Sequence, residues 1–204
     1  MGKKHDASEI EVLDGLEPIR RRPELYAGDV ASSKTTNRLV LEAMCLAVHE
    51  KSAELVQAIA VSVTGDRVRI DYGGPGLPLG KYPGSKLTFI EALMTVLFSC
   101  RDAKTTEAAR SLCGIGITVT NALSSWCTIT VQREGAVWKQ RYERGRATGP
   151  LKRIGKTKTS GTVLEFEIDR SLLKAPLDLP ALRRALKKFE RVVPCVRVQL
   201  DAQG

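Results

Sequence analysis

The stretch "AVSVTGDRVRIDYGGPGLP", residues 60–78, combines two patterns that indicate the fold. Apolar and polar residues alternate on either side of residues 64–66, which predicts a β-hairpin with Tyr72 on its apolar face. Three glycines and two prolines follow within six residues, more glycine than one turn requires. This pattern leaves two interpretations open: a backbone that a ligand approaches closely, or a Pro/Gly-rich loop without a ligand.

Length and composition bound the kind of protein. With 204 residues, 43% of them hydrophobic, we expect a single domain over residues 1–204. No apolar run is long enough to span a bilayer, and residues 1–15 lack the apolar centre of a signal peptide. We therefore expect a cytoplasmic protein with no membrane partner. The five cysteines form no C-x-x-C pair and the two histidines have no metal-ligand spacing with them, so we expect neither a zinc site nor a disulfide.

The chain is basic, with a formal net charge of +9. Lysines and arginines gather at residues 20–22, 139–146, 151–158 and 183–191. Such a field attracts polyanions. No aromatic interleaving or helix-turn-helix spacing accompanies these runs, so solvated surfaces explain most of them.

Most helical periods come early in the chain and most strand patterns come late. Helices are expected at residues 16–22, 35–53, 87–98, 114–123 and 179–189, and strands at 60–72, 127–133, 136–142, 161–168 and 195–200. Ser33 or Thr35 is expected to cap the long helix. Residues 99–112 have the small, polar and charged composition of a lid. We therefore predict an α+β two-layer sandwich, with helices on one face of a mixed, mainly antiparallel sheet.

Glu42, Leu46 and His49 are spaced to lie on one face of the long helix, beside its apolar stripe. An ionised carboxylate in a dry place is costly, so Glu42 needs a reason to be there. One interpretation places it at the helix edge, where it reaches solvent or an arginine. The other places it in a phosphate-binding cleft, where it takes a proton from an attacking water. Gly114 and Gly116 favour the second interpretation, because free N–H groups at the start of a helix attract anions.

The order of these motifs resembles the N-terminal ATPase domain of the gyrase B protein and its topoisomerase IV relative, within the GHKL superfamily. The similar segments are "LDGLEPIRRRPELYAGD", "RLVLEAMCLAVHE", "GGPGLP", "EALMTVLFS", "SLCGIGITVTNALS", "QREGAVWKQRYERG" and "SGTVLEFEI", in order from about residue 10 to residue 201. The resemblance implies a Bergerat fold, in which ATP lies between the helices and the sheet under a lid at residues 99–113.

The resemblance also implies roles for single residues. Glu42 takes the position of the general base, and Thr162 that of a threonine beside the adenine. Arg133 takes the position of a rim arginine that also meets aminocoumarin inhibitors. The implied cofactor-binding positions are Leu46, His49, Asp71, Tyr72, Gly74, Gly76, Pro78, Lys104, Cys113, Gly114, Gly116, Arg133 and Thr162.

The sequence departs from the family's pattern at the positions that carry the chemistry. Leu46 replaces the asparagine that binds Mg²⁺, and His49 replaces the aspartate that follows it. Tyr72 replaces the aspartate that accepts the adenine amino group. Asp71 has the opposite strand parity, so it substitutes for that aspartate only through a bulge.

Two further family residues are replaced, a loop arginine by Pro75 and a lid histidine by Cys113. A hard cation demands oxygen ligands, and Leu46 has none. We therefore expect ATP binding to be weak or lost, and no protein ligand for Mg²⁺ at the family's metal position.

Three functions remain open. The first is a gyrase B-like domain with impaired or lost ATP binding and hydrolysis that acts as a regulatory or interaction module. The second is an active ATPase domain completed by a partner chain, with Asp71 and His49 in the lost roles. The third is a basic scaffold that holds DNA or a topoisomerase subunit. We expect weak or no self-association through an arm at residues 1–14, because residues 1–11 lack an aromatic anchor, and we expect the family's transducer and DNA-cleavage domains to be absent.

Overall fold

The computed structural model describes residues 13–49, 58–97, 99, 114–193 and 196–203. The expected N-terminal arm and lid-like loop lie almost entirely outside these residues, as do Lys104 and Cys113. None of the helices within the described ranges is long and apolar enough to cross a bilayer.

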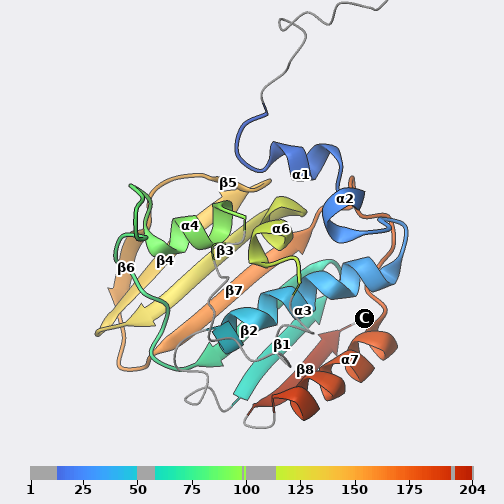
Figure 1. The fold of residues 1–204 in the computed structure, drawn as a ribbon. Helices are drawn as coiled ribbons and strands as arrows, with labels where there is room; N and C mark the ends of the chain where they lie inside the picture. Colours follow the sequence, from blue (N-terminus) through green and yellow to red (C-terminus); the bar gives the residue numbers. More distant parts are fainter. Residues whose placement is uncertain (1–12, 50–57, 98, 100–113, 194–195, 204) are drawn as a thin grey trace, which may run out of the picture.

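One mixed sheet of eight strands forms the centre of the structure (Figure 1). The strands are β1 (Ala58–Thr64), β2 (Arg67–Gly73), β3 (Ser124–Arg133), β4 (Ala136–Glu143), β5 (Arg146–Ala147), β6 (Lys152–Lys156), β7 (Gly161–Ile168) and β8 (Arg197–Gln203). Their order is β5-β4-β3-β7-β2-β1-β8, with β6 paired to β4. All pairings are antiparallel except that of β1 with β8 at the sheet edge, which is parallel.

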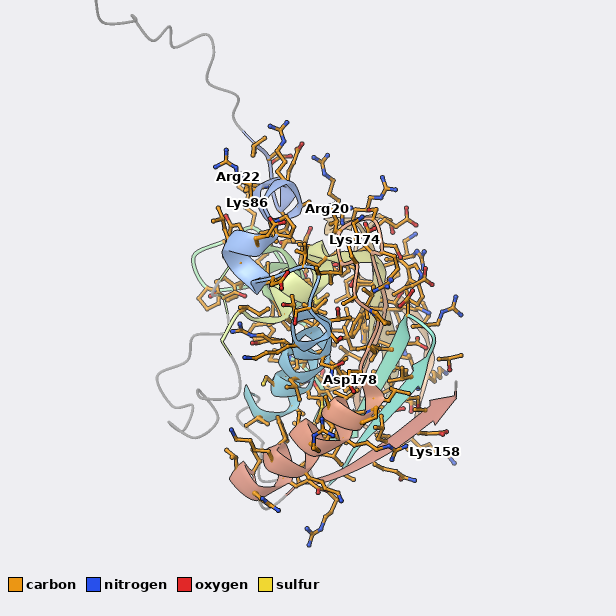
Figure 2. All side chains as sticks on the ribbon, turned by 90° about the vertical axis from the view of Figure 1, so that its right-hand side faces the viewer. Arg20, Arg22, Lys86, Lys158, Lys174 and Asp178 are labelled. Carbon is orange, nitrogen blue, oxygen red and sulfur yellow. The ribbon has the colours of Figure 1, made fainter. Side chains whose placement is uncertain are left out.

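The helices gather on one face of this sheet. They are α1 (Glu17–Arg21), α2 (Glu24–Ala27), α3 (Ser33–His49), α4 (Phe89–Thr95), α6 (Ile117–Ala122) and α7 (Leu179–Val192). Figure 1 shows α3, α4, α6 and α7 in front of the strands, and the side view of Figure 2 shows side chains filling the space between. The long helix α3 contacts α6, α7 and β2. This arrangement confirms the predicted two-layer sandwich.

Local sequence explains most of these elements. In the β1–β2 hairpin, Val61 faces Ile70 and Val63 faces Val68, and all four side chains are buried. Alternation of this kind buries one face of a strand pair and leaves the other to solvent. Helix α7 begins where the Asp178 carboxylate accepts a hydrogen bond of 2.9 Å from the N–H of residue 181.

The structure differs from the sequence expectations at the start of α3 and in the presence of strand β6. Helix α3 begins earlier than expected, and the Ser32 hydroxyl accepts from the Lys34 N–H at 3.3 Å, so neither Ser33 nor Thr35 caps it. Strand β6 was not expected, because all five of its residues are exposed and it has no alternating pattern. Residues 152–156 form a strand because they pair with β4, which no local pattern in the sequence indicates.

Candidate functional site

Glu42 lies near the middle of α3 with a side chain that is 0% exposed. Its Oε1 accepts hydrogen bonds from the backbone N–H groups of Gly114 (2.7 Å) and Ile115 (2.9 Å). Its Oε2 accepts from the N–H of Gly116 at 2.9 Å. The Nε of Arg38, one helical turn earlier, lies 3.5 Å from Oε1. The carboxylate is therefore dry, and its charge is balanced by three donors and one guanidinium.

The two glycines of this segment have separate structural reasons. A Cβ on Gly114 would lie 2.6 Å from an Nη of Arg38, so a side chain there would require this guanidinium to move. Gly116 has a φ of +80°, in the left-handed region that favours glycine. The resemblance implies a position beside the phosphates for these glycines, and in the structure their N–H groups donate to Glu42.

Leu46 lies one turn beyond Glu42 and is 3% exposed, within the hydrophobic core. Its isobutyl group offers no oxygen to a hard cation. His49 is the last residue of α3, and its side chain lies outside the described part of the structure. The position that the resemblance implies for the Mg²⁺ ligand is therefore occupied by a buried, apolar side chain that offers no oxygen.

Tyr72 is 2% exposed and faces the core from β2. Its neighbours across the sheet are Ile59 on β1 and Thr162 on β7, both fully buried. The Thr162 hydroxyl has no hydrogen-bond partner among the described residues. The two positions that the resemblance assigns to the adenine therefore lie side by side, and the one expected to carry a carboxylate carries an aromatic ring.

Asp71 points to the opposite face of the sheet. Its carboxylate lies 2.8 Å from an Nη of Arg69, and the register of β2 with β1 and β7 continues without a shift through Asp71 and Tyr72. The bulge that would turn Asp71 toward the helices is absent from β2. Asp71 therefore lies on the face of β2 opposite to Tyr72, paired with Arg69.

The glycine loop after β2 packs against other parts of the chain. A Cβ on Gly76 would lie 2.6 Å from the carbonyl oxygen of Gln132, and its φ is +75°. Gly74 also has a positive φ, of 127°. Arg133 holds the loop, since its Nη1 donates to the Gly76 carbonyl at 2.8 Å. Protein backbone thus accounts for the closest approach at Gly76, while Pro78 beyond it is exposed.

Sequence reasoning missed two polar residues of this region. Arg38 is spaced four residues before Glu42, and that spacing is a signal for a helical ion pair. Asn121 in α6 is 1% exposed and donates to the Met94 carbonyl at 3.0 Å, while its Oδ1 has no hydrogen-bond partner among the described residues. No local pattern marks Asn121, because its burial results from packing of α6 against α4.

The expectation that all five cysteines are reduced is wrong. Cys45 is disulfide-bonded, and its partner is not among the described residues. Disulfide pairing depends on distance in the fold, so the lack of a C-x-x-C pair does not exclude it. Cys127 is a free, buried thiol whose pKa is raised by burial.

A hollow lies between α1 and the turn after β4. It has a volume of about 510 Å³ and is lined by Glu17, Arg20, Arg21, Glu143, Arg144, Arg146 and Leu172. Glu17 lies 3.4 Å from Arg146, whereas Arg144 has no ion-pair partner in the described part of the chain. Four guanidiniums against two carboxylates make this hollow basic.

Arg20 fixes one wall of the hollow, and Figure 2 shows it at α1. Its Nη1 donates to the Ala122 carbonyl and its Nη2 to the Asp169 carboxylate, both at 2.6 Å. Burial alone raises the pKa of Asp169, but hydrogen bonds from Ser171 and Arg20 outweigh it, so the net shift of the pKa is downward.

The helix-covered mixed sheet, with a buried glutamate on its long helix that faces a glycine pair, defines an α+β sandwich of the GHKL type. Comparison with known proteins shows which proteins the chain is similar to. The DNA gyrase B protein of Thermotoga maritima is 31% identical over 205 residues, and that of Clostridium acetobutylicum is 30% identical over 200 residues. The DNA topoisomerase 4 B protein of Caulobacter vibrioides is 33% identical over 172 residues.

The chain is a homologue of the B proteins of DNA gyrase and topoisomerase IV. The alignment covers 98% of this chain and 32% of the Thermotoga maritima protein, and 81% of this chain and 24% of the Caulobacter vibrioides protein. The chain therefore spans about a third of the length of these gyrase relatives. No protein-family profile matches it.

Proposed function

We propose that this chain is a gyrase B-like domain in which recognition and hydrolysis of ATP are impaired or lost, and that it acts in the cytoplasm as a regulatory or interaction module. The observation that carries the proposal is Tyr72, a fully packed ring at the position where a carboxylate would read the adenine. Asp71, on the other face and paired with Arg69, supplies no replacement. This counts against the alternative of an active ATPase completed by Asp71 and a partner chain.

The expected loss of ATP affinity is large enough to be measured. Loss of a hydrogen bond to a charged acceptor costs about 1.5–3 kcal/mol, or about ten- to 150-fold in affinity. Leu46 adds a second loss, because the metal that neutralises phosphate charge would be held by ATP and water alone. These two losses act at opposite ends of the nucleotide, so we expect them to add.

Titration calorimetry with ATP, with and without Mg²⁺, tests this proposal. We expect weak or undetectable binding, and no increase on addition of Mg²⁺. Tight, Mg²⁺-dependent binding together with turnover that Glu42→Ala abolishes would show that the chain is an ATPase. Thermal shift with the same ligands gives an independent measure, because stabilisation grows with the logarithm of ligand over dissociation constant.

The arginine-lined hollow favours a second candidate, a scaffold that holds DNA or an acidic surface of a topoisomerase subunit. Arg144 and Arg146 lie on one side of it, and the chain carries a net charge of +9. Salt weakens binding through such residues, and the affinity falls more steeply with salt concentration when more phosphate contacts are made.

Fluorescence anisotropy with a labelled DNA duplex tests the scaffold. The variant Arg144→Glu/Arg146→Glu is compared with Arg183→Glu/Arg184→Glu, which makes the same change of charge at exposed positions on α7. We expect only the first variant to weaken binding strongly and to reduce its salt dependence. Equal losses in both variants would mean that DNA responds to net charge alone.

A further inference from the structure

Three consecutive backbone N–H groups, those of residues 114–116, converge on one carboxylate. The distances from their nitrogens to the Glu42 oxygens are 2.7, 2.9 and 2.9 Å. Successive N–H groups aimed at one point form an anion-binding arrangement. The anion held at this point belongs to the chain itself.

This contact and the binding of a phosphate group at the same place exclude each other. Each N–H has one hydrogen, and all three hydrogens are directed at Glu42 at full hydrogen-bond strength. A second anion at the same donors would also be repelled by the buried carboxylate. Because the Glu42 side chain is 0% exposed, it cannot remain ionised and turn aside without another source of solvation.

We propose that Glu42 is an internal occupant of the N–H groups of residues 114–116, and that this autoinhibitory contact excludes phosphate-bearing ligands. The inference rests on the proposed function and extends it from the base end of the nucleotide, where Tyr72 lies, to the phosphate end. It reverses the role that the family position implies for Glu42. A general base contributes to turnover and leaves phosphate binding intact, whereas here removal of the carboxylate increases phosphate binding.

The test uses tripolyphosphate as the probe, because it carries the phosphate chain without the base and so does not depend on Tyr72. Glu42→Ala removes the internal anion and frees the three donors. We expect it to bind tripolyphosphate at least about tenfold more tightly than the parent in titration calorimetry, since hydrogen bonds to a charged group are at stake. The control is Glu24→Ala, which makes the same charge change at an exposed position on α2 and leaves the three donors occupied.

Hydrogen exchange gives a second readout at the donors themselves. In the parent, the N–H groups of Ile115 and Gly116 are hydrogen-bonded and should exchange slowly. In Glu42→Ala they should exchange faster, and saturating tripolyphosphate should slow them again. Slow exchange that persists in Glu42→Ala without ligand would overturn the inference.

Glu42→Gln covers the case in which the alanine variant does not fold. It keeps the shape of the side chain but removes the charge and one acceptor, so we expect it to tighten tripolyphosphate binding as well. If no folded Glu42 variant binds tripolyphosphate more tightly than Glu24→Ala does, the inference fails, even where the parent binds ATP weakly. If the parent binds Mg²⁺–ATP tightly, the proposed function fails instead, whatever the Glu42 variants do with tripolyphosphate.

Discussion

Tyr72→Asp is the substitution that most directly tests the proposed loss of base recognition. It restores a carboxylate next to Thr162, whose hydroxyl has no hydrogen-bond partner among the described residues. A hydrogen bond between an adenine amino group and a charged acceptor contributes about 1.5–3 kcal/mol. We therefore expect ADP to bind about ten- to 150-fold more tightly to this variant than to the parent.

The substitution also has a cost that follows from the packing. Tyr72 is 2% exposed and lies beside the fully buried Ile59 and Thr162, so removal of its ring leaves a cavity. Truncation of a large buried aromatic residue costs about 3–5 kcal/mol, against a typical domain stability of about 5–15 kcal/mol. We expect a lower melting temperature with the fold retained, which circular dichroism and urea unfolding would check.

The assay is calorimetry with ADP in the absence of Mg²⁺, so that only base recognition is measured. Tyr72→Ala is the matched control, because it opens the same cavity without a carboxylate. Leu46→Asn should improve binding only with Mg²⁺ and a triphosphate, and the double variant should show roughly additive gains. A well-folded Tyr72→Asp that binds ADP no better than Tyr72→Ala would refute the reasoning.

Three further predictions concern stability and assembly. Gly76→Ala should lower the free energy of unfolding by about 1–3 kcal/mol, because its Cβ meets a carbonyl at 2.6 Å and its φ is positive, whereas Gly80→Ala, in open space, should be near neutral in urea unfolding. Arg20→Ala should lower it by about 3 kcal/mol, since it leaves the buried Asp169 carboxylate without its cation, and the conservative Arg20→Lys should lose less. The pKa of Asp169 is lowered in the fold, so this pair stabilises above the unfolded carboxyl's pKa of about 4, and unfolding curves from pH 6 to 2 should show that stability lost as pH falls through the folded value. Light scattering should give a monomer at micromolar concentration without nucleotide, and a stable dimer would contradict the expected weakness of the arm.

Local patterns in the sequence account for the sheet, the main helices and the spacing of the site residues. The side-chain period of two in β2 fixes Tyr72 on the core face and Asp71 on the other, and the continuous register agrees. The period of α3 likewise put Glu42 and Leu46 on one face, and both are buried. Strand β6 and Asn121 escaped such reasoning, because the first is paired and the second is buried by neighbours distant in the chain.

The residue pattern alone predicts that Glu42 lies beside the apolar stripe of the long helix and that glycines elsewhere in the chain suit an anion. The contact between these two features comes from the packing of the fold. Their sequence separations, 72 to 74 residues, are beyond the reach of any local periodicity. Once α3 and the start of α6 are packed together, a dry carboxylate must find donors and three free N–H groups must find an acceptor, and the two requirements satisfy each other.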